Sequence, residues 1–392
     1  MKALSFIDAE MAMLQRKHLY RQLRVVQEVL PEGWITMEGR RLLNLSSNNY
    51  LGLANSRLLR EEAGEWLQRF GASASASRLI VGNLSLHQTV EEKIAAFQGA
   101  EAAILYNTGY MANVGVISAL MNKGDFILSD KLNHASIVDG IMLSGAEFRR
   151  YPHGDLNKLE DLLQKGSARN KKLIVTDSVF SVDGDIAPLK EIVELKERFG
   201  AILMIDEAHG GGVFGENRRG VAEMLGVEEA VEVHMGTFSK AFGSYGAYVC
   251  GSMKLVEYLV NRSRPFIYST SLPPAVLGAN LAAIRVVAET PELSRKVLEN
   301  AAYLRQNLNR LGFNTLASAS QIIPLLVGDN RKAVEFASLL FKKGVMAVAI
   351  RPPTVPPKTA RLRLSVTAEH RCKDLDFAIS CLNEVGQALG II

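Results

Sequence analysis

A lysine and an aspartate, 34 residues apart, are the residues of this chain best suited to do chemistry together. Lys240 ends the segment GTFSK (236–240), and Asp206 lies in LMIDEAH (203–209), directly after an apolar run. A lysine amine forms a Schiff base with an aldehyde, a carboxylate keeps a pyridine nitrogen protonated, and hydroxyls and backbone N–H groups receive phosphate. These groups together predict a site for pyridoxal 5'-phosphate (PLP).

The residues beside this pair have both a functional and a structural interpretation. His209 is positioned to reach an oxygen of the cofactor ring, or it is a loop histidine with ordinary partners. Thr237 and Ser239 bind phosphate or complete a turn. Asp206 alone would be an unremarkable strand end, since acidic residues are common there. The prediction therefore depends on the combination of these residues.

Two motifs in the same region match other activities formally. DEAH (206–209) is also a helicase signature, but the phosphate-binding GxxxxGK[ST] loop of that chemistry is absent from the sequence. GGGVFG (210–215) fits GxGxxG, yet the polar ENRRG follows it in place of an apolar helix. An NAD-dependent enzyme stays an alternative that the sequence does not favour.

Three further segments carry candidate site residues. NTGYMANVG (107–115) opens a predicted helix, where the N–H groups of Gly109 and Tyr110 would seat a phosphate; an ordinary N-cap is compatible with this. His134 begins another helix and either stacks on a flat cofactor or caps the helix. Asp177 and Ser181 lie in TDSVFSVDGD (176–185).

The elements that must position these residues alternate between short apolar strands and helices. The predicted strands are AAILY (102–106), DFILSD (125–130), KLIVTD (172–177), AILMID (201–206), VEVHMG (231–236) and AYVCG (247–251). Helices are expected between them, for example over 86–98 and 188–199. The pattern predicts an α/β fold with a mainly parallel, doubly wound sheet. Asp177, Asp206, His209 and Lys240 then all lie at the carboxyl ends of strands, where such sheets bind ligands.

The ends of the chain predict additional structure. Residues 1–30 show apolar spacing typical of an amphipathic helix, and residues 34–46 predict a hairpin that turns at Glu38-Gly39. Long helices are expected over 273–290 and 292–311, followed by a strand within 321–329. We therefore expect an N-terminal segment (1–47), a large cofactor-binding domain (48–275) and a smaller C-terminal α+β domain (276–392).

Composition restricts the function classes. The 392 residues are 48% hydrophobic and 22% charged, and the net charge of +4 is spread along the chain, so no nucleic-acid partner is expected. The three cysteines show no CxxC spacing, which argues against a metal site and a disulfide framework. The N-terminus lacks the apolar core of a signal peptide and no run has the length of a membrane span, so a cytoplasmic protein without a membrane partner is expected.

Taken together, the motifs from SSNNYLGL (46–53) to RLRLSVTAEH (361–370) resemble the α-oxoamine synthase family. This resemblance implies a fold type I PLP-dependent transferase with a mainly parallel, seven-stranded sheet in its large domain. It also implies that Lys240, Asp206 and His134 are catalytic. The cofactor-binding residues that it implies are Gly109, Tyr110, His134, Asp177, Ser181, Asp206, His209, Thr237, Lys240, Ser269 and Thr270. In this set, Ser269 and Thr270 look like the pair that reaches the neighbouring subunit's cofactor, which implies a homodimer with shared sites.

The resemblance also indicates substrates. Asn48 and Arg363 match positions that contact the amino-acid carboxylate together with His134, and Arg21 and Thr354 match positions near the acyl substrate. IRPPTVP (350–356) and YSTSLPP (268–274) look most like the members that condense L-alanine with a pimeloyl thioester of CoA or of a carrier protein. Glycine with acetyl-CoA, and a regulatory subunit without activity, stay open as alternatives. Two departures from the family pattern are GASASASR (71–78), which has few glycines, and Asp177, where glutamate is common.

Overall fold

A computed structural model describes residues 4–166 and 169–392. The chain divides into two compact units, each with its own sheets and core. The larger unit comprises residues 49–181 and 185–296, and the smaller unit comprises the residues up to 48 together with 182–184 and 297–392. The N-terminal segment therefore folds with the C-terminal part of the chain.

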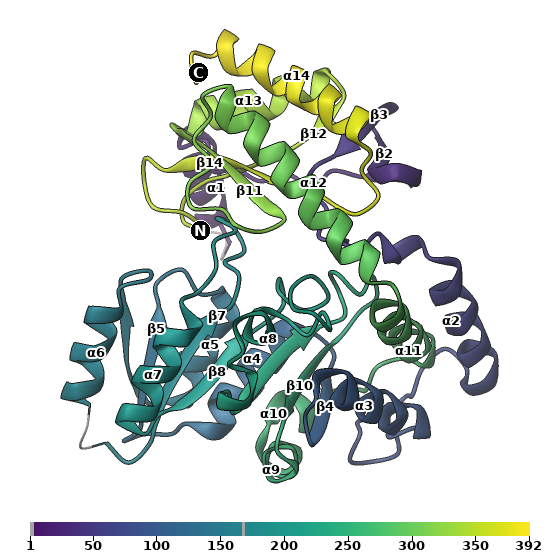
Figure 1. Cartoon of the computed structure of the whole chain (residues 1–392), viewed down its shortest axis with the longest axis vertical. Helices are drawn as coiled ribbons and strands as arrows, with labels where there is room; N and C mark the ends of the chain where they lie inside the picture. The colour runs from purple at the N-terminus through teal and green to yellow at the C-terminus, as the bar shows by residue number, and fades with distance from the viewer. Residues whose placement is uncertain (1–3, 167–168) are drawn as a thin grey trace. The chain divides into compact units, whose positions relative to one another are not determined.

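The larger unit is built on a seven-stranded sheet in the order β4-β10-β9-β8-β7-β5-β6 (Figure 1). Its strands are β4 (Ala102–Tyr106), β5 (Phe126–Asp130), β6 (Glu147–Tyr151), β7 (Lys172–Asp177), β8 (Ile202–Asp206), β9 (Val233–Thr237) and β10 (Ala247–Gly251). The five strands from β9 to β6 are parallel to one another, and β10 is antiparallel to both of its neighbours. This confirms the α/β class and the mainly parallel sheet expected from the sequence.

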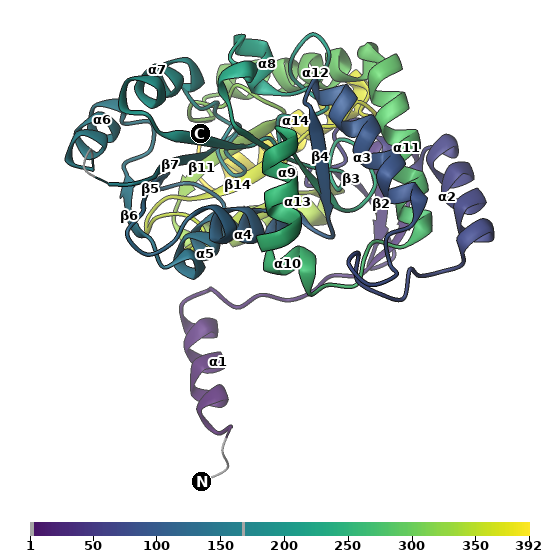
Figure 2. The same ribbon diagram turned by 90° about the horizontal axis from the view of Figure 1, so that it is seen from below.

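Helices cover both faces of this sheet, which is why its strands are apolar throughout. Alternate residues of the strands, such as Leu173 and Val175, pack with buried residues of α4 (Gly109–Leu120), α5 (Ala135–Ser144), α9 (Met253–Arg262) and α10 (Arg264–Ile267). The opposite face contacts α6 (Leu156–Lys165) and α7 (Leu189–Phe199) (Figure 2). The two layers hold the carboxyl ends of β5, β7, β8 and β9 in fixed register.

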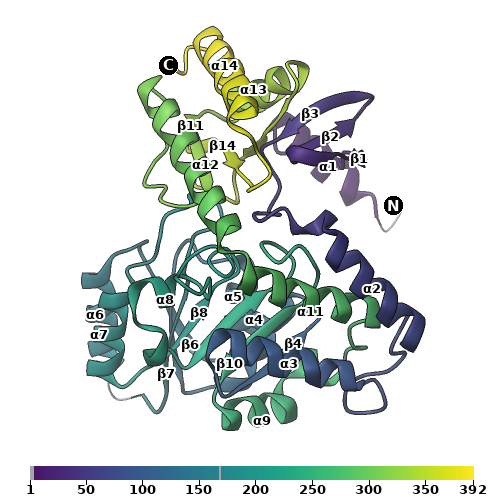
Figure 3. The same ribbon diagram turned by 45° about the vertical axis from the view of Figure 1, so that its right-hand side comes forward.

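The remaining helices of the larger unit lie mainly beside β4. The helix α11 (Pro274–Glu289) packs against both α2 (Arg57–Phe70) and α3 (Ser85–Gln98) (Figure 3). Short elements complete the unit: η2 (Leu53–Asn55), α8 (Val221–Leu225) and η3 (Glu228–Ala230). The long helix α12 (Pro291–Arg310) begins in this unit and continues into the smaller one.

The smaller unit contains two small sheets. One has the order β1-β2-β3-β12 and the other β11-β14-β13. Its elements are α1 (Phe6–Arg16), β1 (Val26–Val29), η1 (Pro31–Gly33), β2 (Trp34–Met37), β3 (Arg40–Asn44), β11 (Ile322–Gly328), α13 (Asn330–Lys342), β12 (Val345–Met346), β13 (Val348–Ile350), β14 (Ala360–Ser365) and α14 (Cys372–Ala388). Ile35, Met37, Leu42 and Phe341 form a buried cluster that joins the N-terminal hairpin to α13.

One expectation about elements was wrong, and one strand was not expected at all. The helix expected over 1–30 extends only over Phe6–Arg16 among the described residues, and Val26–Val29 form a strand instead. Strand pairing with β2 outweighs the helical apolar spacing there, because Val26 and Val29 are β-branched and β2 offers a partner edge. The strand β6 was missed, since EFRRY lacks an apolar run; it lies at the sheet edge, where polar residues are common. The hairpin turning at Glu38-Gly39 is confirmed.

Candidate active site

The carboxyl ends of the parallel strands surround a cavity of about 170 Å³ within the larger unit. Asp177 ends β7 and Asp206 ends β8, and the two residues are paired in register. The residues that line the cavity are Gly109, Tyr110, Asn113, His134, Ser136, Asp177, Ser181, Asp206, Ala208, His209, Met235, Thr237, Ser239 and Lys240. Nine of the eleven residues expected to bind the cofactor are therefore brought together.

Lys240 points its amine toward His209 inside this cavity. The Lys240 Nζ lies 2.8 Å from His209 Nε2, and His209 Nδ1 lies 2.6 Å from the hydroxyl of the buried Tyr50. Lys240 is half-buried and follows β9 by three residues, in a turn closed by the bond from Gly243 N–H to its carbonyl. The chain of contacts Lys240–His209–Tyr50 therefore fixes where the amine sits.

Asp206 is held by groups that leave its carboxylate turned into the cavity. Asn113 Nδ2 donates to Asp206 Oδ2 at 2.8 Å, and the Ala208 N–H donates to Oδ1 at 2.8 Å. Asp206 and Asn113 are only 5% and 1% exposed. A carboxylate in such a buried setting binds a cationic partner strongly, because water does not screen the charge.

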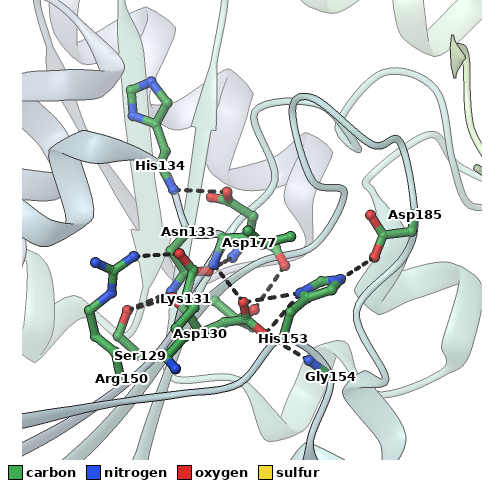
Figure 4. A network of polar contacts seen from close by, with 12 residues as sticks. Ser129, Asp130, Lys131, Asn133, His134, Arg150, His153, Gly154, Asp177 and Asp185 are labelled. Atoms are coloured by element: carbon green, nitrogen blue, oxygen red, sulfur yellow. Dashed lines mark hydrogen bonds and ion pairs between the residues drawn. The ribbon is translucent and has the colours of Figure 1, made fainter. Parts of the chain in front are cut away.

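His134 lies at the start of α5, and Asp177 fixes its backbone. The His134 N–H donates to Asp177 Oδ2 at 3.0 Å (Figure 4). His134 is partly exposed at this edge of the cavity, and its Nδ1 lies 2.7 Å from Ser136 Oγ. Burial raises the pKa of Asp177 well above its usual value, and the adjacent Asp206 charge adds to this. Desolvation lowers the pKa of His134, so its ring favours the neutral form.

The start of α4 provides backbone donors beside the cavity. Thr108 caps the helix: its Oγ1 accepts from the Met111 N–H at 3.1 Å and its carbonyl accepts from the Ala112 N–H at 3.0 Å. The N–H groups of Gly109 and Tyr110 are then the first-turn donors available to an anion. A Cβ at Gly109 would lie 3.1 Å from Met235 Cε, so a larger residue would crowd this helix start.

Two hydroxyl side chains, Thr237 and Ser239, precede Lys240 and line the cavity. Thr237 Oγ1 donates to the Gly246 carbonyl at 2.8 Å, lies 2.7 Å from Ser239 Oγ and accepts from the Ser239 N–H. Thr237 thus both completes the turn before Lys240 and lines the cavity. The structural and the functional interpretation of this residue hold together.

Ser269 and Thr270 do not line the cavity that contains Lys240. Thr270 forms a β-bridge with Ser77, and its carbonyl accepts from Asn107 Nδ2 at 2.7 Å. Ser269 lines a separate surface hollow of about 740 Å³ together with Tyr268 and Arg264. Their expected contact with a neighbouring subunit's cofactor stays a prediction.

The expected substrate residues Asn48, Arg363, Arg21 and Thr354 all belong to the smaller unit. Arg363 Nη2 donates to Asn48 Oδ1 at 3.0 Å, so these two form a pair. Thr354 and Arg21 are exposed, and the Thr354 N–H donates to the Arg351 carbonyl at 3.1 Å. Burial lowers the pKa of Arg351, and the charge of Arg21 adds to this effect.

Sequence reasoning missed three residues that shape the cavity: Tyr50, Asn113 and Ser136. Asn113 carried a signal, since it lies four residues after Gly109 and therefore on the same face of α4. Ser136 follows His134 by two residues at a helix start, where hydroxyls usually bond locally. Nothing in the sequence around Tyr50 indicates contact with a histidine 159 positions later.

The glycines of GGGVFG have a structural role in this fold. The segment forms turns, and the next helix begins only at Val221. A Cβ at Gly210 would lie 1.9 Å from Glu207 Oε2, and one at Gly220 would lie 2.5 Å from Glu207 Cδ. The glycines therefore let the chain approach the buried Glu207 carboxyl, which accepts from Ser178 Oγ at 2.5 Å and from the Ala222 N–H at 2.9 Å.

The residues present fit PLP by their chemistry. The cavity combines an amine (Lys240), a buried carboxylate (Asp206), first-turn amides of a helix and a hydroxyl (Thr237). These are the partners of an aldehyde, a pyridinium nitrogen and a phosphate. Within residues 4–166 and 169–392, no group of three or more His, Cys, Asp or Glu side chains is arranged to hold a metal, and no helix has both the length and the apolarity to cross a membrane.

Comparison with known proteins agrees with this chemistry. Residues 40–382 match the family of aminotransferases class I and II. An 8-amino-7-oxononanoate synthase from Geobacter sulfurreducens is 48% identical over 389 residues, which cover 98% of this chain and 99% of the relative. A serine palmitoyltransferase from S. paucimobilis, solved with bound PLP and myriocin, matches with a TM-score of 0.94 at 32% identity, over 99% of this chain and 98% of that one.

A solved 8-amino-7-oxononanoate synthase from Francisella tularensis matches with a TM-score of 0.78 at 26% identity, over 90% of this chain and 99% of that one. These likenesses extend over nearly the whole chain, and the site retains the amine and the carboxylate that PLP chemistry needs. The cofactor is therefore PLP, and the protein is an acyltransferase. The chain belongs to the aminotransferase class I and II family and, within it, to the α-oxoamine synthases of fold type I.

Proposed function

We propose that the protein condenses L-alanine with a pimeloyl thioester of CoA or of an acyl carrier protein. The products are 8-amino-7-oxononanoate, carbon dioxide and the free thiol, and the reaction is a step of biotin biosynthesis. One observation carries this choice: relatives named 8-amino-7-oxononanoate synthase are 46–48% identical to the chain along almost its entire length. The chain's match to solved serine palmitoyltransferases is lower in identity, at 32–33%.

The proposed chemistry needs a base beside the α-carbon of the amino acid. PLP, when bound, supplies a protonated ring that stabilises negative charge on that carbon. Lys240 Nζ removes the α-proton and later returns a proton to the same carbon. His209 Nε2, at 2.8 Å from Nζ, holds the amine at one position so that the proton moves over a short and reproducible path.

Asp206 is proposed to set the charge of the cofactor ring, and His134 is proposed to orient the ring. The Asp206 carboxylate keeps a proton on the ring nitrogen, and Asn113 orients the carboxylate by donating to Oδ2. We propose that the His134 imidazole packs on the ring face, for which its neutral form is suited, because a cationic ring would repel a protonated pyridine. Gly109, Tyr110 and Thr237 would hold the phosphate.

Arg363 and Asn48 are proposed to bind the amino-acid carboxylate. A guanidinium binds a carboxylate through two parallel hydrogen bonds, and the 3.0 Å bond to Asn48 fixes one of its nitrogens. Arg21 and Thr354 are proposed to contact the acyl substrate. A cytoplasmic location is proposed as well, because CoA thioesters and the amino acid are both available there.

A homodimer with shared sites is also proposed. The larger unit exposes large apolar side chains around one surface hollow: Leu143 is 68% exposed and Tyr268 is 71% exposed. Exposed apolar surface of this kind is typical of protein–protein contacts. Ser269 lines the same hollow, which supports its expected contact with the neighbouring subunit's cofactor.

One specific observation supports a second candidate. The TM-score to the serine palmitoyltransferase, 0.94, is higher than that to the solved 8-amino-7-oxononanoate synthase, 0.78. The second candidate reaction is therefore the condensation of serine with a long-chain acyl thioester, and it is tested together with the first. Glycine with acetyl-CoA is included as the reaction of another branch of the family.

The experiment measures product by mass spectrometry after incubation of the PLP-loaded protein with each pair of substrates. L-Alanine with pimeloyl-CoA should give 8-amino-7-oxononanoate at a rate well above that of serine with palmitoyl-CoA and of glycine with acetyl-CoA. Pimeloyl carrier protein, used at the same concentration, separates the two acyl donors. Preferential turnover of serine or glycine would overturn the proposal while leaving the cofactor and the family unchanged.

A further inference from the structure

His153 lies between two carboxylates behind the cofactor cavity, and no step of the proposed reaction uses it. Figure 4 shows its ring between Asp130 and Asp185. The His153 Nδ1 is 3.0 and 3.1 Å from the two oxygens of Asp130, and Nε2 is 2.7 Å from Asp185 Oδ2. The side chains of Asp130 and Asp185 are 3% and 14% exposed.

Both ring nitrogens of His153 face groups that accept hydrogen bonds. An ionised carboxylate has no proton to donate, so each contact requires an N–H on the ring. Burial opposes the positive charge, but the hydrogen bonds to Asp130 and Asp185 outweigh it and raise the pKa of His153 to about 10. The imidazolium therefore holds both carboxylates together at neutral pH.

The first carboxylate controls the loop that carries His134. Asp130 ends β5; its Oδ1 accepts from the Leu132 N–H at 2.8 Å and its carbonyl accepts from the Asn133 N–H at 3.3 Å. Asn133 continues the connection, because its Oδ1 accepts from the Asp177 N–H at 3.0 Å and its Nδ2 donates to the Val175 carbonyl at 2.7 Å. The next residue along the chain is His134.

The second carboxylate belongs to Asp185, which is itself part of the loop that carries Ser181. The Asp185 carbonyl accepts from the Phe180 N–H at 3.0 Å, and a β-bridge joins Val179 to Ile186. The His153 ring also packs edge-on against Phe180, with ring centroids 4.4 Å apart. His153 thus touches the Ser181 loop through both a charge and an aromatic contact.

We propose that His153 is a positioning residue of the cofactor site, which fixes the His134 loop and the Ser181 loop relative to each other. The two loops start from neighbouring strands, β5 and β7. Both His134 and Ser181 line the cavity. Without the bridge, Asn133 and His134 would still be bonded to the end of β7, but Asp185 and the Ser181 loop would lose their ion-pair link to Asp130. The inference needs PLP as cofactor and is independent of the identity of the substrates.

The test compares His153→Gln with Lys158→Gln. In His153→Gln, the glutamine side chain is neutral and reaches one carboxylate at most. Lys158→Gln is the control, because it removes an exposed ion pair with Asp161 in the following helix and leaves both loops unchanged. The dissociation constant of PLP is measured by titrating each apoprotein without substrates. We expect it to rise by roughly ten- to a hundredfold for His153→Gln, by analogy with residues that orient the ligands of metal ions, and to stay at the wild-type value for Lys158→Gln.

Two further readouts, the visible circular dichroism of bound PLP and the unfolding midpoint, distinguish positioning from a general loss of stability. The visible circular dichroism of bound PLP reports how the ring is seated, and it should change in His153→Gln at saturating PLP. A PLP affinity within about twofold of wild type, the scatter of a neutral surface substitution, would overturn the proposal even if the unfolding midpoint fell.

If His153→Gln does not fold, Asp185→Ala gives the same decision. It leaves the contacts of His153 with Asp130 and Phe180 in place and removes only the ion pair to Asp185 in the Ser181 loop. A weakened PLP affinity with altered circular dichroism supports the proposal, and wild-type values of both contradict it. Because no acyl donor or amino acid is added, this result does not depend on the outcome of the substrate assay.

Discussion

Lys240 has two duties in the proposed reaction, since its amine holds the cofactor and also moves the α-proton of the substrate. Lys240→Ala should lower turnover by about 10³-fold or more, the scale of a lost general base. The visible absorbance of covalently held PLP should disappear as well. Spectra and single-turnover rates measure both effects. Lys158→Gln serves as the control, and full activity of Lys240→Ala without an added amine would contradict the assignment.

Glu207 stands next to Asp206 but faces away from the cavity, and it predicts a pH dependence. Burial raises the pKa of its carboxyl to about 7, although hydrogen bonds from Ser178 and Ala222 oppose the shift. The folded state thus favours the protonated form, so this contribution to stability is complete below the unfolded pKa of 4.5 and is lost as the pH rises through about 7.

Glu207→Gln should therefore be stabilised relative to wild type as the pH rises. The difference in the free energy of unfolding between the two proteins should grow by up to about 3 kcal/mol between about pH 5 and about pH 8. Urea unfolding at both pH values measures it. The exposed Glu191→Gln is the matched control. An equal difference at the two pH values would show that Glu207 does not titrate in this range.

At the scale of elements, the start of α4 links stability with cofactor binding. Thr108→Ala removes the cap on the Met111 N–H and should lower the free energy of unfolding by about 1 kcal/mol. It should also weaken PLP binding, because the first-turn amides lose their fixed direction. Asp329→Ala removes an equivalent cap from α13, where Asp329 accepts from the Lys332 N–H at 2.9 Å.

The Asp329→Ala variant should show a similar loss of stability in urea with unchanged PLP affinity. Equal PLP affinities of the two variants would mean that the α4 amides do not bind the phosphate. This comparison separates the general effect of a helix cap from a specific effect on the cofactor.

The elements also show why sequence predicted part of the molecule and missed the rest. The central strands were predicted because their buried faces require long apolar runs, and the residues after them were predicted because strand ends gather at one edge. β1 and β6 are edge strands that carry no apolar run of their own, so their pairing with β2 and β5 leaves no strand signal in their sequences. Tyr50 and the His153 bridge depend on tertiary contacts, so local patterns predict neither, whereas the helical spacing from Gly109 gives a local signal for Asn113.

At the scale of the whole molecule, the proposed homodimer predicts complementation between two inactive variants. Lys240→Ala lacks the amine, and Thr270→Asp would place a carboxylate against the neighbouring subunit's phosphate. If subunits mix at random, half of the dimers are mixed and one of their two sites is intact. The mixture should recover about a quarter of the wild-type rate. No recovery, or a monomer in light scattering, would contradict shared sites.

The division of the chain into 1–47, 48–275 and 276–392 stays a prediction, which limited proteolysis of the native protein would test. The compact units follow spatial contacts, and they group the N-terminal segment with the C-terminal part of the chain.

The residues that line the cofactor cavity all belong to the larger unit, whereas the four residues expected only at the substrates belong to the smaller one. Substitutions can therefore change the substrate residues without changing the residues that line the cofactor cavity. Substitutions of Arg21, Asn48, Thr354 and Arg363 would change which amino acid and which thioester are accepted. The residues that bind the cofactor would stay the same. This separation predicts that changes at these four positions alter the choice of substrate without altering the binding of PLP.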